Sequence, residues 1–220
     1  MSKLKRKIFL VDDHPLVREW LTTLIHQQPD LMVCGEAESA SQALEGISTQ
    51  KPDVAIVDIS LKGASGIELI KNLKSLRPSV AIIVLTMHDE SLYAERALRA
   101  GARGYIMKRE TAKRIIAAIR DVLEGKLYVS ERLTKLFAEK FVVGQTTTVS
   151  SPIEQLSDRE LEVFQLYGQG CETRQIAESL NVSMKTVQAY CARIKEKLRL
   201  SNATELLREA IRWHESQQAK

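Results

Sequence analysis

The sequence has few cysteines, no long apolar run and little net charge, and the first two shortages exclude whole classes of protein. Its three cysteines among 220 residues lie far apart and include no C-x-x-C pair, which argues against a disulfide framework and a structural zinc site. No apolar run approaches the roughly 18 residues of a membrane span. The basic N-terminal segment also has its apolar stretch interrupted at Asp12. We therefore expect a cytoplasmic protein that does not bind membranes.

The small net charge of +4 becomes informative only when it is divided along the chain. Residues 151–220 contain ten basic and ten acidic side chains, so the whole excess lies in residues 1–150. If the C-terminal part binds nucleic acid, it must use a local basic stripe. Hydrophobic residues make up 44% of the chain, which excludes general disorder, and the length allows one large or two modest domains.

The first 124 residues alternate short apolar runs with longer amphipathic patterns. The apolar runs are rich in β-branched residues and nearly continuous, as in parallel strands that are buried on both faces: 7–11, 31–35, 54–57, 81–85 and 104–107. The patterns between them have helical periodicity: 15–28, 40–50, 67–76, 92–100 and 112–124. Ser39 with Gln42 has capping-box spacing, and Thr111 is a candidate cap of the fifth helix. Five such βα units predict a doubly wound α/β domain.

The remaining residues predict a tether followed by a helical domain. Residues 125–143 have the pattern of one amphipathic helix, and the small polar residues 144–152 form the best linker candidate. From residue 153 onward the pattern predicts four helices, with Ser157 and Glu160 as a capping box and Ser183 as a cap. The second and third helices are spaced as a helix-turn-helix. The expected domains are 1–125, a linker with an amphipathic helix at 126–152, and a small all-α domain at 153–220.

Polar side chains follow four of the five predicted strands. They are Asp12 and Asp13 after the first strand, Asp58 after the third, Thr86 at the end of the fourth and Lys108 after the fifth. Because parallel strands end at one edge, the three carboxylates should converge there, and their repulsion would be relieved by a hard cation such as Mg²⁺. Carboxylates with a metal, a hydroxyl and a lysine suit phosphoryl transfer to an aspartate. His14 and His88 lie near this edge, and we expect them to be solvated or to cap helices.

This set of residues resembles the receiver domain of two-component response regulators over about residues 6–125. The resemblance implies that Asp58 accepts a phosphoryl group from a histidine kinase. It implies a Mg²⁺ site formed by Asp12, Asp13, Asp58 and the backbone carbonyl of Ser60. It also implies that Thr86 and Tyr105 form a switch pair, with Lys108 beside the phosphoryl group.

The third C-terminal helix has two distinct faces. Val187, Cys191, Ile194 and Leu198 form an apolar stripe, while residues 183–199 carry five basic side chains and one acid. Residues 156–198 resemble the LuxR/NarL-type helix-turn-helix, and with a receiver in front the chain resembles a NarL/FixJ-type response regulator. The resemblance implies double-stranded DNA as the ligand. Base-facing residues would be Gln188, Ala189 and Ala192, and phosphate contacts would be Lys185, Thr186, Arg193 and Lys197.

Two residues of this helix depart from the family pattern. The family often has Lys at the position of Gln188 and His at the position of Tyr190. Lys favours guanine, whereas Gln pairs with adenine, so we expect an altered base preference near the half-site centre.

The last helix carries a stripe of Leu206, Ala210 and Trp213, with Leu207 and Ile211 beside it. We expect this stripe to support a homodimer on DNA, which would match two-fold symmetric half-sites. The alternative is a helix that is fully used by the core of its own domain.

Two other functions remain open at this point. An aspartate-nucleophile phosphohydrolase would use the same acidic edge, but such enzymes usually have a second Asp where this chain has Ser60. A protein-interaction adaptor would have a helical domain that binds no DNA. We expect a regulator that is not a turnover enzyme.

Overall fold

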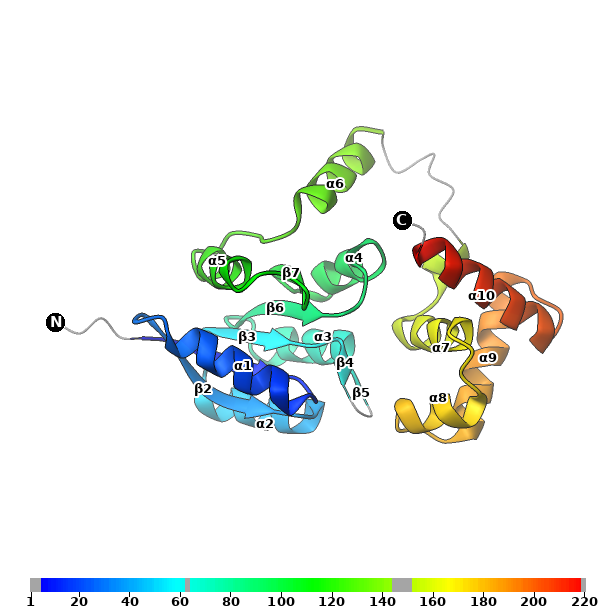
Figure 1. Cartoon of the computed structure of the whole chain (residues 1–220), viewed down its shortest axis with the longest axis horizontal. Coiled ribbons are helices and arrows are strands. Elements are labelled where there is room, and N and C mark those ends of the chain that lie inside the picture. The colour runs from blue at the N-terminus through cyan, green and yellow to red at the C-terminus, as the bar shows by residue number, and fades with distance from the viewer. Residues whose placement is uncertain (1–4, 62–63, 144–151, 219–220) are drawn as a thin grey trace. The chain divides into compact units, whose positions relative to one another are not determined.

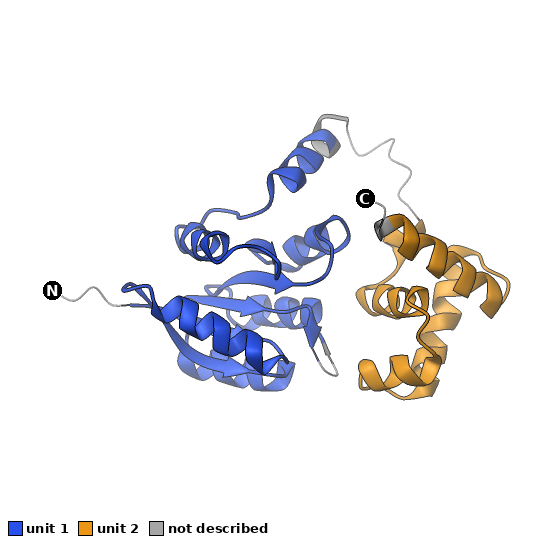
Figure 2. Cartoon of the chain, viewed as in Figure 1, with its two compact units in different colours: residues 1–144 blue, residues 145–220 orange. Residues whose placement is uncertain are grey.

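The computed structural model describes residues 5–61, 64–143 and 152–218, and the chain forms two compact units. Figure 2 shows these units, which span residues Met1–Gly144 and Gln145–Lys220. Of the expected linker, residues 144–151 lie outside the described part. Within the described residues, no helix has the length and apolar character that a membrane span requires.

The first unit contains a five-stranded parallel sheet, which confirms the predicted fold class. Its strands are β1 (Arg6–Val11), β2 (Leu31–Ala37), β3 (Val54–Val57), β6 (Ala81–Thr86) and β7 (Gly104–Met107). They lie in the order β2-β1-β3-β6-β7 (Figure 1). From β1 the chain first adds β2 on one side and then adds β3, β6 and β7 on the other. The switch point, where such sheets bind ligands, therefore lies between β1 and β3.

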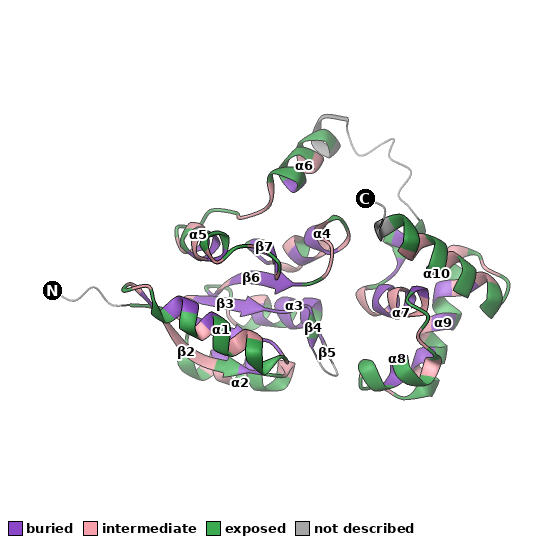
Figure 3. Cartoon of the chain, in the orientation of Figure 1, coloured by how far each residue is buried: buried purple, intermediate pink, exposed green. Residues whose placement is uncertain are grey.

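Helices cover both faces of this sheet because each central strand is buried on both sides. The helices are α1 (Pro15–His26), α2 (Ala40–Gln50), α3 (Gly66–Leu76), α4 (Glu90–Ala100) and α5 (Ala112–Leu123). Ile8 and Leu10 of β1 pack in one core cluster with α1 and α5. Phe9 points to the other face, where its ring lies against Gly46 of α2. Figure 3 shows the buried strands between partly exposed helices.

A short hairpin that the sequence did not predict follows β3. Its strands are β4 (Ser60–Leu61) and β5 (Ala64–Ser65), which pair antiparallel just before α3. Gly66 then donates its backbone N–H to Ile59 at 2.8 Å. Any Cβ on Gly66 would collide with the backbone oxygen of Asp58, so only glycine permits this close return of the chain.

The amphipathic helix after α5 begins later than the sequence predicted. Helix α6 spans Glu131–Val143, not residues 125–143. Upstream of it, the Tyr128 backbone accepts from Tyr105 at 3.0 Å and donates to Arg103 at 2.9 Å. This pairing satisfies backbone hydrogen-bonding groups on the outer edge of β7. It also keeps the residues around Tyr128 extended rather than helical.

The second unit is entirely helical, as predicted. Its elements are η1 (Pro152–Gln155), α7 (Asp158–Gly168), α8 (Thr173–Ser179), α9 (Met184–Leu198) and α10 (Ala203–Gln218). Helices α7 and α10 approach closely at Gly168, where a Cβ would lie 2.5 Å from the backbone oxygen of Ala210. This close contact brings α10 against the core of the unit.

The predicted helix caps have mixed outcomes. Ser157 and Glu160 form the expected reciprocal capping box, and Ser183 accepts from the Thr186 N–H at 3.1 Å. Ser39 caps α2, but the Gln42 side chain accepts from Glu38 rather than from Ser39, so no box closes there. Thr111 is the N-cap residue of α5, as predicted, but its side chain makes no cap hydrogen bond.

Candidate functional site

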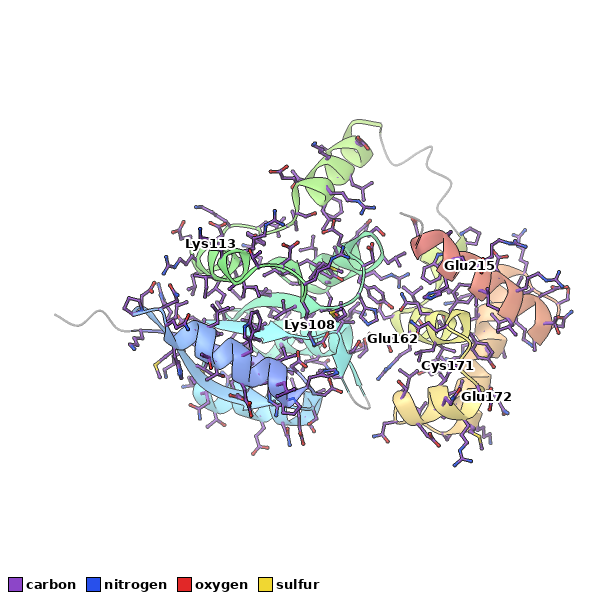
Figure 4. The ribbon with its side chains drawn as sticks, in the orientation of Figure 1. Lys108, Lys113, Glu162, Cys171, Glu172 and Glu215 are labelled. Atoms are coloured by element: carbon purple, nitrogen blue, oxygen red, sulfur yellow. The ribbon has the colours of Figure 1, made fainter. Side chains whose placement is uncertain are left out.

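The buried cation of Lys108 joins two carboxylates at the carboxyl edge of the sheet. Its Nζ lies 2.6 Å from Asp58 Oδ2 and 2.7 Å from Asp12 Oδ2. Figure 4 labels Lys108 at this edge. Asp58 and Asp12 are each only 3% exposed, so their charges are shielded from water and are neutralised chiefly by this lysine.

Backbone hydrogen bonds between strands fix the positions of these groups. The Asp58 N–H donates to the Val11 carbonyl at 2.8 Å, which continues the β1–β3 ladder past the last strand residue. The Lys108 N–H likewise donates to the Thr86 carbonyl at 2.8 Å. The side chains therefore converge because the strands that carry them are in register.

The electrostatics of the cluster favour the charged form of its lysine. Burial alone lowers the pKa of Lys108, but the charges of Asp58 and Asp12 and their hydrogen bonds outweigh burial. The pKa of Lys108 is therefore raised above its ordinary value. The ammonium remains protonated at neutral pH and supplies a fixed positive charge beside Asp58.

The donor set at this edge fits a divalent cation. Single ligand atoms from Asp12, Asp13, His14 and Asp58 all lie within 4.8 Å of one another. Asp13 Oδ1 is buried and makes no hydrogen bond. A buried carboxylate oxygen in a group of oxygen donors is suited to a hard cation such as Mg²⁺.

Ser60 lies beside the carboxylate of Asp58. Its backbone N–H donates to Asp58 Oδ1 at 3.2 Å, which orients that oxygen. Its side-chain Oγ lies 2.7 Å from Nε2 of His88. This contact joins two residues that lie 28 positions apart in the sequence.

Thr86 and Tyr105 both lie inside the molecule. Thr86 is fully buried, and its Oγ1 accepts from the His88 N–H at 3.4 Å. Tyr105 is 2% exposed, and its hydroxyl donates to the His88 carbonyl at 2.9 Å. Burial raises the pKa of Tyr105 well above its usual value, with further contributions from Tyr93 and nearby acids, so this hydroxyl stays a hydrogen-bond donor.

Sequence reasoning missed the part that His88 plays in this site. His88 contacts Ser60, Thr86 and Tyr105 through separate atoms, and its ring lies 4.5 Å from the ring of Tyr93. Burial lowers the pKa of His88, although Asp58 acts in the opposite sense. Its position two residues after Thr86 was the available signal.

Helix α9 in the second unit has one buried and one open face, as predicted. Val187, Cys191 and Ile194 are buried against the rest of the unit. The candidate DNA-facing residues are exposed, except Thr186, which is half-buried: Lys185, Thr186, Gln188, Ala189, Ala192 and Arg193. Two exposed alanines in mid-helix leave the backbone open to close approach by a ligand, between polar and basic neighbours.

Two families match this chain, and they match different units. The response regulator receiver domain matches residues 8–120. The luxR family of bacterial regulatory proteins matches residues 154–210. The chain belongs to the response regulator family. It is a two-domain response regulator, with a receiver domain and a LuxR-type DNA-binding domain as in the NarL family.

Relatives support this assignment, and two of the following three match over almost the full chain. The oxygen regulatory protein NreC of Staphylococcus epidermidis is 36% identical over 211 residues, which is 94% of this chain and 97% of the relative. RcsB of Salmonella enterica, solved on promoter DNA, is 26% identical to this chain. The match covers 94% of this chain and 98% of the RcsB chain, with a TM-score of 0.63. A LuxR-family response regulator from Aurantimonas is 34% identical. The match covers 63% of this chain and 99% of the Aurantimonas chain, with a TM-score of 0.59.

Lys197 of this response regulator differs from the other candidate phosphate contacts. Its Nζ lies 2.6 Å from Glu160 Oε2 and donates to the Gln155 carbonyl at 3.1 Å. Glu160 is buried and also accepts from the Ser157 N–H at 2.7 Å. The Lys197 ammonium is therefore paired within its own domain, where it ties α9 to the start of α7, although its side chain is 37% exposed.

Two of the three residues predicted to form the dimer contact, Leu206 and Ala210, are buried in the regulator's second unit, and Trp213 is half-buried. Leu206 and Ala210 are 1% and 0% exposed, and the ring of Trp213 lies 5.6 Å from that of Phe164. This placement corrects the prediction, because a buried side chain has no surface to offer a second copy. The apolar residues that α10 exposes are Leu207 and Ile211, at 38% and 37%.

Proposed function

We propose that Asp58 is phosphorylated by a histidine kinase and that this phosphoryl group controls DNA binding. The observation that carries the proposal is the contact of Lys108 Nζ with Asp58 Oδ2 at 2.6 Å. In the transfer, the N–P bond of the kinase phosphohistidine breaks and a P–O bond to Asp58 forms. Lys108 neutralises charge that develops on the transferred group.

The same cluster would hold Mg²⁺ through oxygen atoms. Its ligands would be the carboxylates of Asp12, Asp13 and Asp58 and the backbone carbonyl of Ser60. When bound, the ion supplies positive charge for the phosphoryl oxygens. The residues of the chain orient the acceptor, since the Ser60 N–H and Lys108 hold different oxygens of Asp58.

Phosphorylation would act on the domain through Thr86 and Tyr105. It adds about −1.5 to −2 charge and three acceptor oxygens at the sheet edge. The Thr86 hydroxyl can rotate from the His88 N–H toward these oxygens, because the present contact is long at 3.4 Å. His88 also carries the carbonyl that holds the Tyr105 hydroxyl, so a shift of His88 reaches the aromatic ring.

Helix α9 would read double-stranded DNA in the major groove. Gln188, Ala189 and Ala192 would face bases, while Lys185, Thr186 and Arg193 would contact phosphates. Lys197 would reach DNA only by leaving Glu160, so we assign it a positioning role. RcsB structures solved with DNA, one of them on a promoter with phosphomimetic BeF3⁻, support this use of the domain.

A homodimer on DNA would use the exposed apolar residues of α10. Leu207 and Ile211 lie four positions apart and therefore share one side of the helix. A structure described as two RcsB dimers on two parallel DNAs supports a dimeric form. In this proposal residues 1–125 receive the signal, 126–152 connect, and 153–220 bind DNA in the cytoplasm. No external substrate is turned over.

A comparison of phosphorylated and unphosphorylated protein tests this function. The full chain and Asp58→Ala are incubated with acetyl phosphate and Mg²⁺, and incorporation is measured by phosphate-affinity electrophoresis. DNA footprint sequencing follows on both proteins. We expect incorporation and tighter binding only in the chain with Asp58. Equal footprints in both states would exclude control by phosphorylation, and turnover of a small phosphoester would favour a phosphohydrolase.

A further inference from the structure

The two sides of the acidic cluster face different nitrogen groups. Lys108 Nζ contacts the Oδ2 atoms of Asp12 and Asp58. On the other side, Nδ1 of His14 lies 3.1 Å from Asp12 Oδ1 and 2.8 Å from Asp13 Oδ1. The lysine therefore leaves the Oδ1 side to a second cation, and the imidazole nitrogen already lies there.

The ring of His14 takes no part in the core or in the cap of α1, and its Nδ1 forms a hydrogen bond with Asp12 Oδ1. His14 is the N-cap residue of α1, but its side chain makes no cap hydrogen bond. Its side chain is 63% exposed, so the ring fills no core space. Its backbone N–H donates to Asp12 Oδ1 at 2.9 Å, which holds the residue beside the carboxylates. Pro15 then starts the helix and restricts the backbone next to the ring.

The distances allow one ion to contact this nitrogen together with the carboxylates. Ligand atoms of Asp12, Asp13, His14 and Asp58 lie within 4.8 Å of one another, and the buried Asp13 Oδ1 lies 2.8 Å from Nδ1 of His14. We propose that His14 Nδ1 is a direct ligand of Co²⁺, Ni²⁺ or Zn²⁺ at this site, whereas Mg²⁺ binds there through the carboxylates alone. The inference rests on the metal site of the proposed function.

The nitrogen ligand changes which ions the site prefers. Imidazole suits Co²⁺, Ni²⁺ and Zn²⁺, whereas Mg²⁺ prefers oxygen ligands and retains its waters. Binding of the borderline ions should therefore depend strongly on His14, and binding of Mg²⁺ should not. The exposure of the ring lets a water replace it when Mg²⁺ is bound.

Metal titration of the full chain tests the assignment. Dissociation constants for Mg²⁺ and Ni²⁺ are measured by calorimetry for the wild type, His14→Gln and His14→Asn. In His14→Gln we expect Ni²⁺ affinity to fall about tenfold or more, with Mg²⁺ affinity changed by less than about threefold. Asparagine places a short amide near the Nδ1 position, so His14→Asn should bind Mg²⁺ normally and also lose Ni²⁺ preference. The control is His26→Gln, an exposed histidine at the far end of α1.

A spectroscopic measurement separates direct ligation from an indirect effect. With Co²⁺ bound, the wild type should show a paramagnetically shifted imidazole signal in NMR spectra, and His14→Gln should lack it. Equal Ni²⁺ affinities in the wild type and His14→Gln, without a shifted signal, would overturn the inference while leaving Mg²⁺ binding intact. If Asp13→Asn changes the affinity for neither Mg²⁺ nor Co²⁺, the result contradicts the proposed metal site itself.

Discussion

Nε2 of His88 lies 2.7 Å from Oγ of Ser60, two residues after the proposed phosphoacceptor Asp58. The contact joins the hairpin after β3 to the loop after β6. The lowered pKa of His88, caused chiefly by burial, keeps its ring neutral at pH 7. Whichever tautomer is present, Ser60 occupies Nε2, so this nitrogen is not free to take a proton from an attacking water. We therefore propose that the pair shields Asp58 from water rather than serving as a general base through Nε2.

Removing this shield should shorten the lifetime of the phosphoryl group. In His88→Ala, water gains access to Asp58, and we expect hydrolysis of the acyl phosphate to accelerate about threefold to tenfold, or about 1 kcal/mol of barrier. Loss of phosphorylated protein is followed by phosphate-affinity electrophoresis after removal of the donor. His26→Gln is the control. Slower hydrolysis in His88→Ala would show that His88 assists water instead.

The stability of the second unit should depend on the charge of Glu160. Burial raises the pKa of Glu160, but hydrogen bonds from Lys197 and Ser157 outweigh it and lower the pKa below its ordinary value. A lowered folded-state pKa gives stability that is present above the unfolded value of about 4.3 and is lost as pH falls through the folded value. Glu160→Gln keeps an acceptor for Ser157 but loses the ion pair with Lys197.

We expect Glu160→Gln to lower the free energy of unfolding by about 1–2 kcal/mol at pH 7 and by progressively less below pH 4. The measurement is urea unfolding followed by Trp213 fluorescence, in chains that carry Trp20→Phe so that one tryptophan reports. Glu154→Gln, at an exposed glutamate of the same unit, is the control. If the difference in the free energy of unfolding between the wild type and Glu160→Gln is unchanged at pH 3, the ion pair is not its source.

The sequence predicted those parts of the structure that depend on local pattern. The apolar runs predicted the five parallel strands, and Asp12, Asp58 and Lys108 could be placed together because strands of a parallel sheet end at one edge. The pairing of Tyr128 with β7 was missed, since an amphipathic pattern does not reveal an open strand edge. Contacts such as Lys197 with Glu160 join residues 37 positions apart. No local signal distinguishes such a lysine from one that binds phosphate.

Gln188 should determine a base preference. Its side chain is exposed on α9, and an amide pairs with adenine, whereas a lysine favours guanine. We expect Gln188→Lys to change the preferred base at one position of each half-site. The difference in binding free energy between the two bases at that position should be about 1–3 kcal/mol. Selection from randomised operators measures this, with Lys185→Ala as the matched variant that should weaken all sequences alike. An unchanged preferred sequence would contradict the assignment of Gln188 as base-facing.

Neighbouring leucines of α10 should respond in opposite ways to an introduced charge. Leu206 is buried in its own unit, so Leu206→Asp should unfold that unit, because an isolated buried carboxylate is strongly unfavourable. Leu207 is 38% exposed, so Leu207→Asp should leave the fold intact but prevent two copies from pairing. Binding is compared on DNA with one half-site and with two, while circular dichroism reports folding.

For Leu207→Asp we expect unchanged affinity for the single half-site and loss of the cooperative gain on the double site. Ile211→Asp should behave in the same way, since it lies one turn away on the same side of α10. Thr204→Asp, at an exposed polar residue of α10, controls for the added charge. Retained cooperativity in both apolar variants would exclude this side of α10 as the dimer contact, because a carboxylate cannot be buried there without a partner.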